Sequence, residues 1–279
     1  MASPSGRRGS GNAFVRVVGT DDVQAAAVAR SAFTGLGLRR VAVIDDTDTF
    51  GVGVADRFSA AWTALGGTIV GRQGAPAGTT DYLPILTALA AQGPDALLFG
   101  GMTATGAATV RRQMAQAGLG ELPFLAGEGL VDGTGEDAGS FVAVAGAAAA
   151  GSWSTSASVA DYPGRAAFEE AFRARYGGSP PAYGNDAYAC GQVITAAIAR
   201  VAADGPVTRE AVRRAVTDPG ATFDTVLGPI AFDANGDPTV AVSTLYRVDL
   251  GIDPDPAVPG AGAWVPVARI DVPGASPTP

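Results

Sequence analysis

The chain has 279 residues, of which 47% are hydrophobic and 16% charged, and its formal net charge is −8. This balance predicts a compact α/β protein with a substantial core and excludes a disordered chain. All 19 basic residues are arginine, and no basic stripe interrupts the acidic composition, so the chain is a poor candidate for binding nucleic acids or anionic membranes. The absence of histidine excludes Ser-His-Asp and Cys-His catalysis and imidazole metal sites.

The single cysteine and the chain's first residues add two further limits. Cys190 cannot form an internal disulfide, and its helical surroundings predict a buried, inert thiol. Residues 1–12 are polar and rich in glycine and serine, which predicts a flexible lead-in without the apolar segment of a secretory signal. No apolar run approaches the ~20 residues that a membrane-spanning helix needs.

The first half of the chain alternates strand and helix patterns. Short apolar runs predict strands, and longer runs with helical spacing and capping residues predict helices. In chain order we expect a strand at 14–19, a helix at 20–37, a strand at 39–46, a helix at 49–67, a strand at 68–73, a helix at 80–93, a strand at 95–101, a helix at 104–119 and a strand at 123–129.

This alternation predicts a parallel sheet with right-handed helical crossovers. In such sheets, ligands bind beyond the carboxyl ends of the strands. The segments at 45–51, 100–106 and 127–133 all follow strands at that end. We therefore expect Glu128, a lone carboxylate between two glycines, to lie on the rim where the ligand binds.

The second half of the chain has a different pattern. Residues 151–164 are small, polar and typical of a hinge, and helices are predicted at 165–176, 180–203 and 208–218. Two strands around the Asp233–Asp237 turn are expected within 228–251, and the tail is expected to fray beyond 263–270. Residues 151–232 thus contain three helices but almost no sheet, which predicts an incomplete domain.

Five residues are candidates for a ligand site, and each has a plainer alternative. Glu128 is suited to hold an ammonium group, or it is a solvated loop acid. Phe50 follows the second strand. It would either line a ligand cleft or belong to the core at the start of a helix. Met102, with Thr103 beside it, follows two glycines that let backbone approach a ligand, or it fills a gap in the core. Tyr183 precedes a helix. It would either contact the ligand or pack on the first turn of the helix as a hydrophobic staple.

Other patterns give no cofactor or metal site. The acids of Asp46–Asp48 and Asp233–Asp237 resemble calcium loops but lack the full spacing, so a helix-cap cluster and a hairpin turn are expected. The glycines at 35–37 and 51–53 lack the spacing of a dinucleotide site. We therefore expect no cofactor.

Several segments, in order, resemble one protein family. They are VGTDDVQAAAVA, RRVAVIDDTDTFGVGVADRF, GTTDYLPILTAL, PDALLFGG, RRQMAQAGL, GEGLVDG, AYGNDAYACGQVI and LGPIAFDANGDPTVAVSTLYRV. Together, over about residues 14–250, they resemble the substrate-binding proteins of branched-chain amino acid ABC transporters, the leucine/isoleucine/valine-binding type.

The resemblance implies an α/β fold of the type I periplasmic-binding class, with one complete parallel-sheet lobe and the helical remainder of a truncated lobe. The complete lobe would comprise residues 21–152 and 238–270, and the partial lobe residues 156–232, between the lead-in 1–12 and a tail at 271–279. Crossing segments would lie near 19–21, 152–158 and 233–238, and ligand would be held as the lobes close.

The resemblance also implies roles for the candidate residues. Glu128 matches the acid that receives the ligand's α-ammonium group. Phe50 matches an aromatic at the cleft wall, Tyr183 matches an aromatic near the ligand side chain, and Met102 occupies a position that is often aromatic. The implied partners are a small amino acid and an ABC permease/ATPase complex outside the cytoplasmic membrane.

One departure from the family shapes the expected affinity. In the family, several strands precede the segment matching Phe14–Gly19 and carry the groups that clamp the ligand carboxylate, whereas this chain has its lead-in there. We therefore expect weak amino acid binding, and either lowered stability or self-association. An alternative is a ligand-sensing regulatory module of the same fold, responding to an amide or amino acid. An enzyme is disfavoured, because no nucleophile–base pair is present.

Overall fold

A computed structural model describes residues 13–252 and 262–273 of the chain. The predicted lead-in 1–12 lies outside the described residues, as does 274–279 of the predicted tail. The chain divides into two compact units. The larger unit comprises Gln24–Ser156 and Thr244–Ala268, and the smaller unit comprises the described parts of Met1–Val23, Ala157–Ser243 and Arg269–Pro279.

The larger unit is built on a seven-stranded sheet. The elements up to residue 156 are α1 (Asp21–Arg30), the π turn η1 (Ser31–Gly35), β1 (Arg40–Asp45), α2 (Thr49–Ala64), β2 (Thr68–Gly74), α3 (Leu83–Ala90), β3 (Ala96–Gly100), η2 (Thr103–Thr105), α4 (Ala107–Met114), β4 (Phe124–Ala126), η3 (Glu128–Leu130), α5 (Phe141–Ala145), η4 (Gly146–Ala149) and β5 (Ser152–Ser156). The strand order is β2-β1-β3-β4-β5-β8-β9, where β8 is Val240–Asp249 and β9 is Ala263–Pro273. Strands β1 to β5 pair in parallel, and β8 pairs antiparallel with β5.

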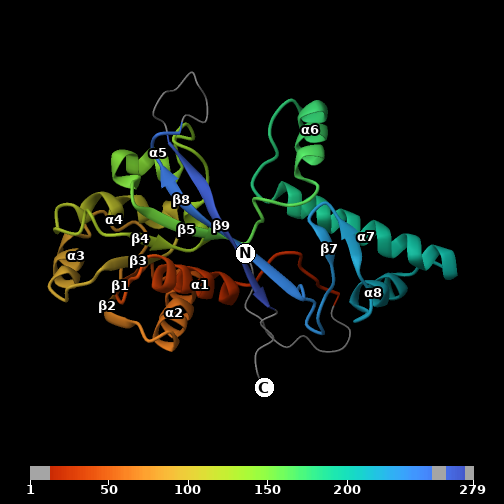
Figure 1. The fold of residues 1–279 in the computed structure, drawn as a ribbon, viewed down its shortest axis with the longest axis horizontal. Coiled ribbons are helices and arrows are strands. Elements are labelled where there is room, and N and C mark those ends of the chain that lie inside the picture. The colour runs from red at the N-terminus through yellow and green to blue at the C-terminus, as the bar shows by residue number, and fades with distance from the viewer. Residues whose placement is uncertain (1–12, 253–261, 274–279) are drawn as a thin grey trace. The chain divides into compact units, whose positions relative to one another are not determined.

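Helices cover both faces of this sheet (Figure 1). Because successive strand residues point to opposite faces, Leu97 and Phe99 pack on α3, α4 and α5, while Leu98 packs on α1 and α2 with Phe58 and Trp62. Strands β3 and β4 are buried along their whole length. Burial on both faces explains why these strands appear in the sequence as continuous apolar runs.

Strand β5 differs from the hinge expected at residues 151–164. Ser152, Ser154 and Thr155 are each 0% exposed, and β5 lies between β4 and β8 in the sheet. A polar strand can be buried where its hydroxyls find acceptors, and Ser154 Oγ donates to the Gly127 carbonyl at 2.5 Å. The small polar residues therefore form a central strand at 152–156, and irregular chain follows from Ala157 to Gly164.

The smaller unit carries three helices and a short hairpin. Its elements are α6 (Arg165–Tyr176), α7 (Gly184–Asp204), α8 (Arg209–Thr217), β6 (Phe223–Thr225) and β7 (Gly228–Ile230), with β6 and β7 forming a separate two-stranded antiparallel sheet. The small core of this unit groups Val193 and Ala197 of α7 with Val216, Phe223 and Phe232. The three helices agree with the predicted ones.

The turn at Asp233–Asp237 forms as predicted. The amides of Asn235 and Asp237 both donate to Asp233 Oδ1, and Gly236 has a φ of +82°, which favours glycine. Residues 14–19, in contrast, form no strand. That segment is held through Arg16, whose amide donates to the Gly236 carbonyl at 2.9 Å and whose guanidinium pairs with Asp237 at 2.7 Å. An apolar run becomes a strand only where a ladder partner lies beside it.

At the other end of the chain, β9 extends to Pro273 and so enters the predicted tail at 271–279. Among the described residues, no helix combines the length and the apolar character needed to cross a membrane.

Candidate functional site

The carboxyl ends of β1, β3 and β4 lie together at one edge of the large sheet. Asp45 at the end of β1 pairs with Gly100 of β3, and Phe99 of β3 pairs with Ala126 of β4. The segments that follow these strands are therefore neighbours in space. They carry four of the five predicted site residues, namely Phe50, Met102, Thr103 and Glu128.

Phe50 lies half-buried in the first turn of α2. Asp46 shapes the approach to this turn, because its Oδ1 accepts the Asp48 amide at 3.0 Å and its own amide donates to the Gly100 carbonyl. A Cβ on Gly51 would stand 2.4 Å from that same carbonyl. Glycine at this position therefore lets the start of α2 rest on the end of β3.

Met102 and Thr103 follow β3 in a tight 3-10 turn, and both are half-buried. The Met102 amide donates to Thr105 Oγ1 at 2.9 Å, and that hydroxyl donates to the Met102 carbonyl at 3.0 Å. These two bonds close the turn. Within the described part of the chain, Thr103 Oγ1 is buried without a hydrogen-bond partner, which costs free energy unless another group satisfies it.

Glu128 opens the turn after β4 and is half-buried. A Cβ on Gly129 would lie 2.5 Å from the Gly101 carbonyl and 2.9 Å from Met102 Cγ. The turn that carries Glu128 is thus packed directly on the turn that carries Met102. The bond from Ser154 to the Gly127 carbonyl holds the same turn from the side of β5.

Acidic side chains lie at this edge of the sheet. Asp46 is 0% exposed, and its Oδ2 has no hydrogen-bond partner among the described residues. Burial and the charge of Asp46 raise the pKa of Tyr82 above its ordinary value. The carboxylate of Asp45 forms an ion pair with the guanidinium of Arg72 at 2.9 Å. Within residues 13–252 and 262–273, no cluster of three metal-ligating side chains occurs.

Tyr183, the fifth candidate, belongs to the smaller unit, where it directly precedes α7 and is 36% exposed. Its φ is +62°, and the other non-glycine residue with positive φ in the described chain is Thr47 with +64°. This conformation is a genuine outlier for a β-branched residue such as threonine. Backbone strain of this kind clusters at functional sites; here one instance is the candidate Tyr183 itself, and the other, Thr47, lies three residues before the candidate Phe50.

Two residues at the large sheet's edge escape prediction from the sequence. Ser154 lies in a segment with the composition of a hinge, and Asp46 has the spacing of a helix-cap acid. For Ser154, the local pattern of small polar residues offers no signal of burial. For Asp46, the position at the end of an apolar run could have indicated burial, because a side chain there either enters the core or points to solvent.

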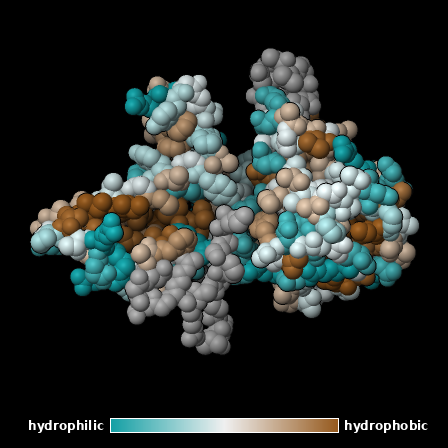
Figure 2. All heavy atoms as spheres, turned by 180° about the vertical axis from the view of Figure 1, so that it is seen from behind, coloured by the Kyte–Doolittle hydropathy of each residue, from teal (hydrophilic) through white to brown (hydrophobic). Residues whose placement is uncertain are grey.

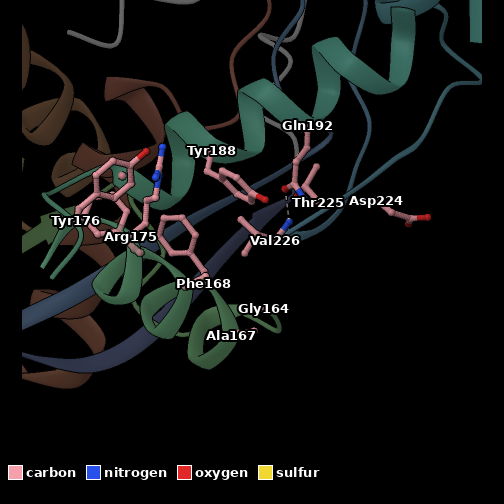
Figure 3. A pocket seen from close by; sticks show the side chains of 13 residues that line it. Gly164, Ala167, Phe168, Arg175, Tyr176, Tyr188, Gln192, Asp224, Thr225 and Val226 are labelled. Carbon is pink, nitrogen blue, oxygen red and sulfur yellow. Dashed lines mark hydrogen bonds between the residues drawn. The ribbon is translucent and has the colours of Figure 1, made fainter. Parts of the chain in front are cut away.

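The smaller unit also has a groove of about 740 Å³ between α6, α7 and β6. Aromatic side chains line it, with the rings of Phe168 and Tyr188 5.2 Å apart, and Gln192 closes one end by accepting the Val226 amide (Figure 3). None of the five predicted site residues lines this groove. Three of its aromatic residues, Phe168, Phe172 and Tyr176, come from the helix expected at 165–176.

A parallel sheet covered by helices on both faces, an antiparallel β8 beyond β5, and a helical second unit together define a type I periplasmic-binding fold. The comparisons with known proteins agree with this class. Residues 2–253 match the periplasmic binding protein family, and the chain belongs to it. The fold class expected from the sequence is thereby confirmed.

Two of three similar proteins are named for amino acid binding. Leu/Ile/Val-binding protein homolog 1 of Brucella abortus is 30% identical over 247 residues, which cover 88% of this chain and 63% of the relative. A leucine-binding protein, LivK, of Thermotoga maritima superposes with a TM-score of 0.73 at 27% identity, covering 94% of this chain and 69% of that protein. An ABC transporter substrate-binding protein of Sphaerobacter thermophilus gives a TM-score of 0.69 at 28% identity, covering 88% and 64%. The chain thus spans less than two thirds of the curated relative's length.

Proposed function

We propose that the chain is the solute-binding component of an ABC transporter for small amino acids of the branched-chain type. It would work outside the cytoplasmic membrane and deliver its ligand to a permease/ATPase complex. The observation that carries the proposal is the packing of the Glu128 turn on the Met102–Thr103 turn at the carboxyl edge of the large sheet. That edge is where open α/β sheets bind small ligands.

Each candidate residue takes a distinct role in this proposal. Glu128 accepts the ligand's ammonium group in a charge-assisted hydrogen bond. Phe50 and Met102 provide apolar wall around the aliphatic side chain, and Thr103 offers a hydroxyl that the described residues leave unsatisfied. Tyr183, in the smaller unit, is a further proposed contact to the ligand side chain.

The relatives support a branched-chain ligand, since the Brucella abortus protein is named as a Leu/Ile/Val-binding protein homolog and the Thermotoga maritima protein as a leucine-binding protein. The alternative of a regulatory sensor gains no support from these names. The family consists of binding proteins, which also supports capture of a ligand over its chemical conversion.

The 279-residue chain is expected to bind its ligand weakly. The groups proposed here serve the ammonium and the side chain, whereas no contact to the ligand carboxylate is assigned. A charge-assisted hydrogen bond is worth about 1.5–3 kcal/mol, so binding without two or three such bonds to the carboxylate would be weaker by orders of magnitude.

Three related ligands test the proposal by NMR titration or calorimetry. Leucine is compared with 3-methylbutylamine, which lacks the carboxylate, and with 4-methylpentanoate, which lacks the ammonium. We expect leucine and the amine to bind with similar dissociation constants, weaker than about 1 μM, and the acid to bind at least about tenfold more weakly than either. Sub-micromolar leucine binding would contradict the expected weakness. Equal binding of 4-methylpentanoate and 3-methylbutylamine would contradict the proposed role of Glu128 as the acceptor of the ligand's ammonium group.

A variant pair locates the effect. Glu128→Gln should weaken the binding of leucine and of the amine by about tenfold or more, because the amide keeps the shape but loses the charge. Glu121→Gln is the matched control, since this exposed acid precedes β4 at the opposite end of the strand. The control should bind both ligands as the unaltered chain does.

A further inference from the structure

The two exposed flanks of helix α7 differ in their chemistry. Figure 2 shows hydrophobic residues gathered in a brown band over the smaller unit. On one flank of α7 the exposed apolar side chains are aliphatic, namely Ile194 and Ile198. On the flank beside α6 the exposed side chain is aromatic, with Tyr188 52% exposed. Aliphatic surface offers burial alone, whereas aromatic rings also stack on flat molecules. We call the aromatic side, between α6, α7 and β6, the α6–α7 groove.

A continuous row of rings lines the α6–α7 groove. The ring centroids of Phe168 and Phe172 are 6.0 Å apart, those of Phe172 and Tyr176 are 4.6 Å apart, and Phe168 lies 5.2 Å from Tyr188. None of the residues of α6 is buried, and Tyr176 is 70% exposed. The row lies outside the hydrophobic core of the unit. Exposed contiguous apolar surface of this kind marks an interaction site.

Small residues keep the groove open. Ala167 and Ala171 line it beside the rings of α6. Gly164 brings the start of α6 against the β6–β7 hairpin, since its amide donates to the Val226 carbonyl at 3.0 Å and a Cβ there would stand 2.6 Å from Val226 Cγ2. The resulting volume of about 740 Å³ is in the range of small-ligand sites. All these residues belong to the smaller unit, so the groove is formed within one unit.

Polar groups stand at opposite ends of the groove (Figure 3). At one end lies Arg175, which forms no ion pair with any residue that the structure describes. At the other end, Gln192 Oε1 accepts the Val226 amide at 2.7 Å, which fixes the side-chain amide and leaves its Nε2 hydrogens to be donated. Asp224 also lines the groove, but its carboxylate points away from the rings (Figure 3). The groups that face the rings are therefore hydrogen-bond donors, one of them charged.

We propose that the α6–α7 groove is a second ligand site, which takes a planar aromatic carboxylate. The ring system lies against Phe168 and Tyr188, where it stacks on aromatic faces. The carboxylate pairs with the guanidinium of Arg175, whose parallel N–H donors match its two oxygens. An oxygen at the far end of the ring system accepts a hydrogen bond from Gln192. This ligand differs in chemistry from a branched-chain amino acid, and the proposal does not rest on the proposed function.

The test uses two ligands that differ in charge alone. The probe, 6-hydroxy-2-naphthoate, carries a carboxylate and a hydroxyl at opposite ends of a flat ring system, and 6-(aminomethyl)-2-naphthol replaces the carboxylate by a cation. Each is titrated into the isotope-labelled full chain, with the NMR shifts of the Gln192 side-chain amide and the Val226 amide as readout. We expect the probe to bind with a dissociation constant between about 10 μM and 1 mM. The amine should bind at least about tenfold more weakly. Because aromatic rings by themselves attract cations, a preference for the anion reports the contribution of Arg175.

Three variants assign the contacts. Arg175→Gln should weaken binding of the probe about tenfold and leave binding of the amine as it is or tighter. Arg173→Gln is the matched control, because Arg173 is exposed on the same helix and does not line the groove, and it should bind the probe as the unaltered chain does. Tyr188→Leu should weaken the probe about three- to tenfold through the loss of stacking. Since Tyr188 is half exposed, the circular dichroism of this variant should match that of the unaltered chain.

Four results would overturn the proposal. The first is the absence of saturable shifts at Gln192 and Val226. The second is binding of the amine as tight as that of the probe. The third is an equal loss in Arg175→Gln and Arg173→Gln, because the attraction would then be unspecific. The fourth is a set of shifts confined to the turns after β1, β3 and β4, which would place the probe at the edge of the large sheet. No variant here alters Glu128 and no readout uses leucine, so failure of this proposal leaves the proposed function standing.

Discussion

At the scale of single residues, Asp186 is a carboxylate buried in the first turn of α7. It is 4% exposed, Ser158 Oγ donates to its Oδ2 at 2.6 Å, and its Oδ1 has no hydrogen-bond partner in the described part of the chain. Burial raises the pKa of Asp186 to about 6 from an ordinary value of 3.8, against the opposing effect of the Ser158 bond. The folded chain therefore holds the Asp186 proton more tightly than the unfolded chain does.

This pKa predicts a pH-dependent stability. Below about pH 4 both states are protonated and the carboxyl adds no penalty. Between about pH 4 and pH 6 stability falls as pH rises, because the unfolded chain releases the Asp186 proton while the folded chain still holds it. Asp186→Asn should keep the Ser158 contact, flatten this dependence, and raise the free energy of unfolding at pH 7.5 by on the order of 1–3 kcal/mol. Denaturant unfolding at pH 5.0 and 7.5 measures both effects.

The control for this prediction is Asp204→Asn, which removes the same charge from the exposed end of the same helix. It should leave the difference in stability between the two pH values as it is in the unaltered chain. A variant Asp186→Asn that is less stable than the unaltered chain at pH 7.5 would show that the charged carboxylate is stabilising, contrary to this account.

At the scale of elements, β5 connects the core to the candidate site. Its Ser154 hydroxyl supports the Gly127 carbonyl, and Gly127 directly precedes Glu128. The next residue, Thr155, is equally buried, but its Oγ1 has no partner among the described residues. Neighbouring hydroxyls on one strand thus have opposite energetic roles. One satisfies a buried acceptor, and the other is desolvated without compensation.

Substitution of these two residues separates the roles. Ser154→Ala should lower the free energy of unfolding by about 1–3 kcal/mol and weaken leucine binding, because the Gly127 carbonyl loses its donor and the Glu128 turn loosens. Thr155→Val removes the unpartnered hydroxyl while nearly keeping the shape, so stability should stay or rise. Chemical denaturation and leucine titration check both variants. Equal losses in the two would mean that packing, and not the hydrogen bond, is what β5 supplies.

At the scale of the whole molecule, stability is unevenly distributed between the units. In the larger unit, α2 buries five residues, among them Phe58 and Trp62, which stack at 5.5 Å. In the smaller unit, α6 buries none of its residues. Regions with few buried apolar contacts open at low free-energy cost. The smaller unit should therefore be the first part of the chain to open.

Hydrogen exchange monitored by mass spectrometry measures this order directly. Amides of α6 should exchange first, those of α7 next, and those of α2 and β3 last, with roughly tenfold or greater separation between α6 and α2. Moderate urea should widen the separation by exposing the smaller unit before the larger one. Equal protection of α6 and α2 would show a single cooperative unit and contradict the uneven distribution.

The neighbourhood of the Glu128 and Met102 turns could be predicted from the sequence, because the carboxyl ends of parallel strands meet at one edge. The burial of Ser154 could not, since small polar residues are common in loops and become a central strand only when β4 and β8 lie on either side. The strand expected at 14–19 is absent for the converse reason, since an apolar run needs a partner to become a strand. The predicted division into lobes at 21–152 and 156–232 stays a prediction.

The amino-acid sequence by itself determined the alternation of strands and helices, the parallel direction of the sheet, the family resemblance and the rim position of Glu128. These follow from local periodicity and chain connectivity, which are properties of neighbouring residues. Only the tertiary structure decided that β5 is buried, that Asp46 lacks a partner for one oxygen, and that α7 leaves an apolar flank open. Burial depends on which distant segments lie alongside, and no local pattern specifies that.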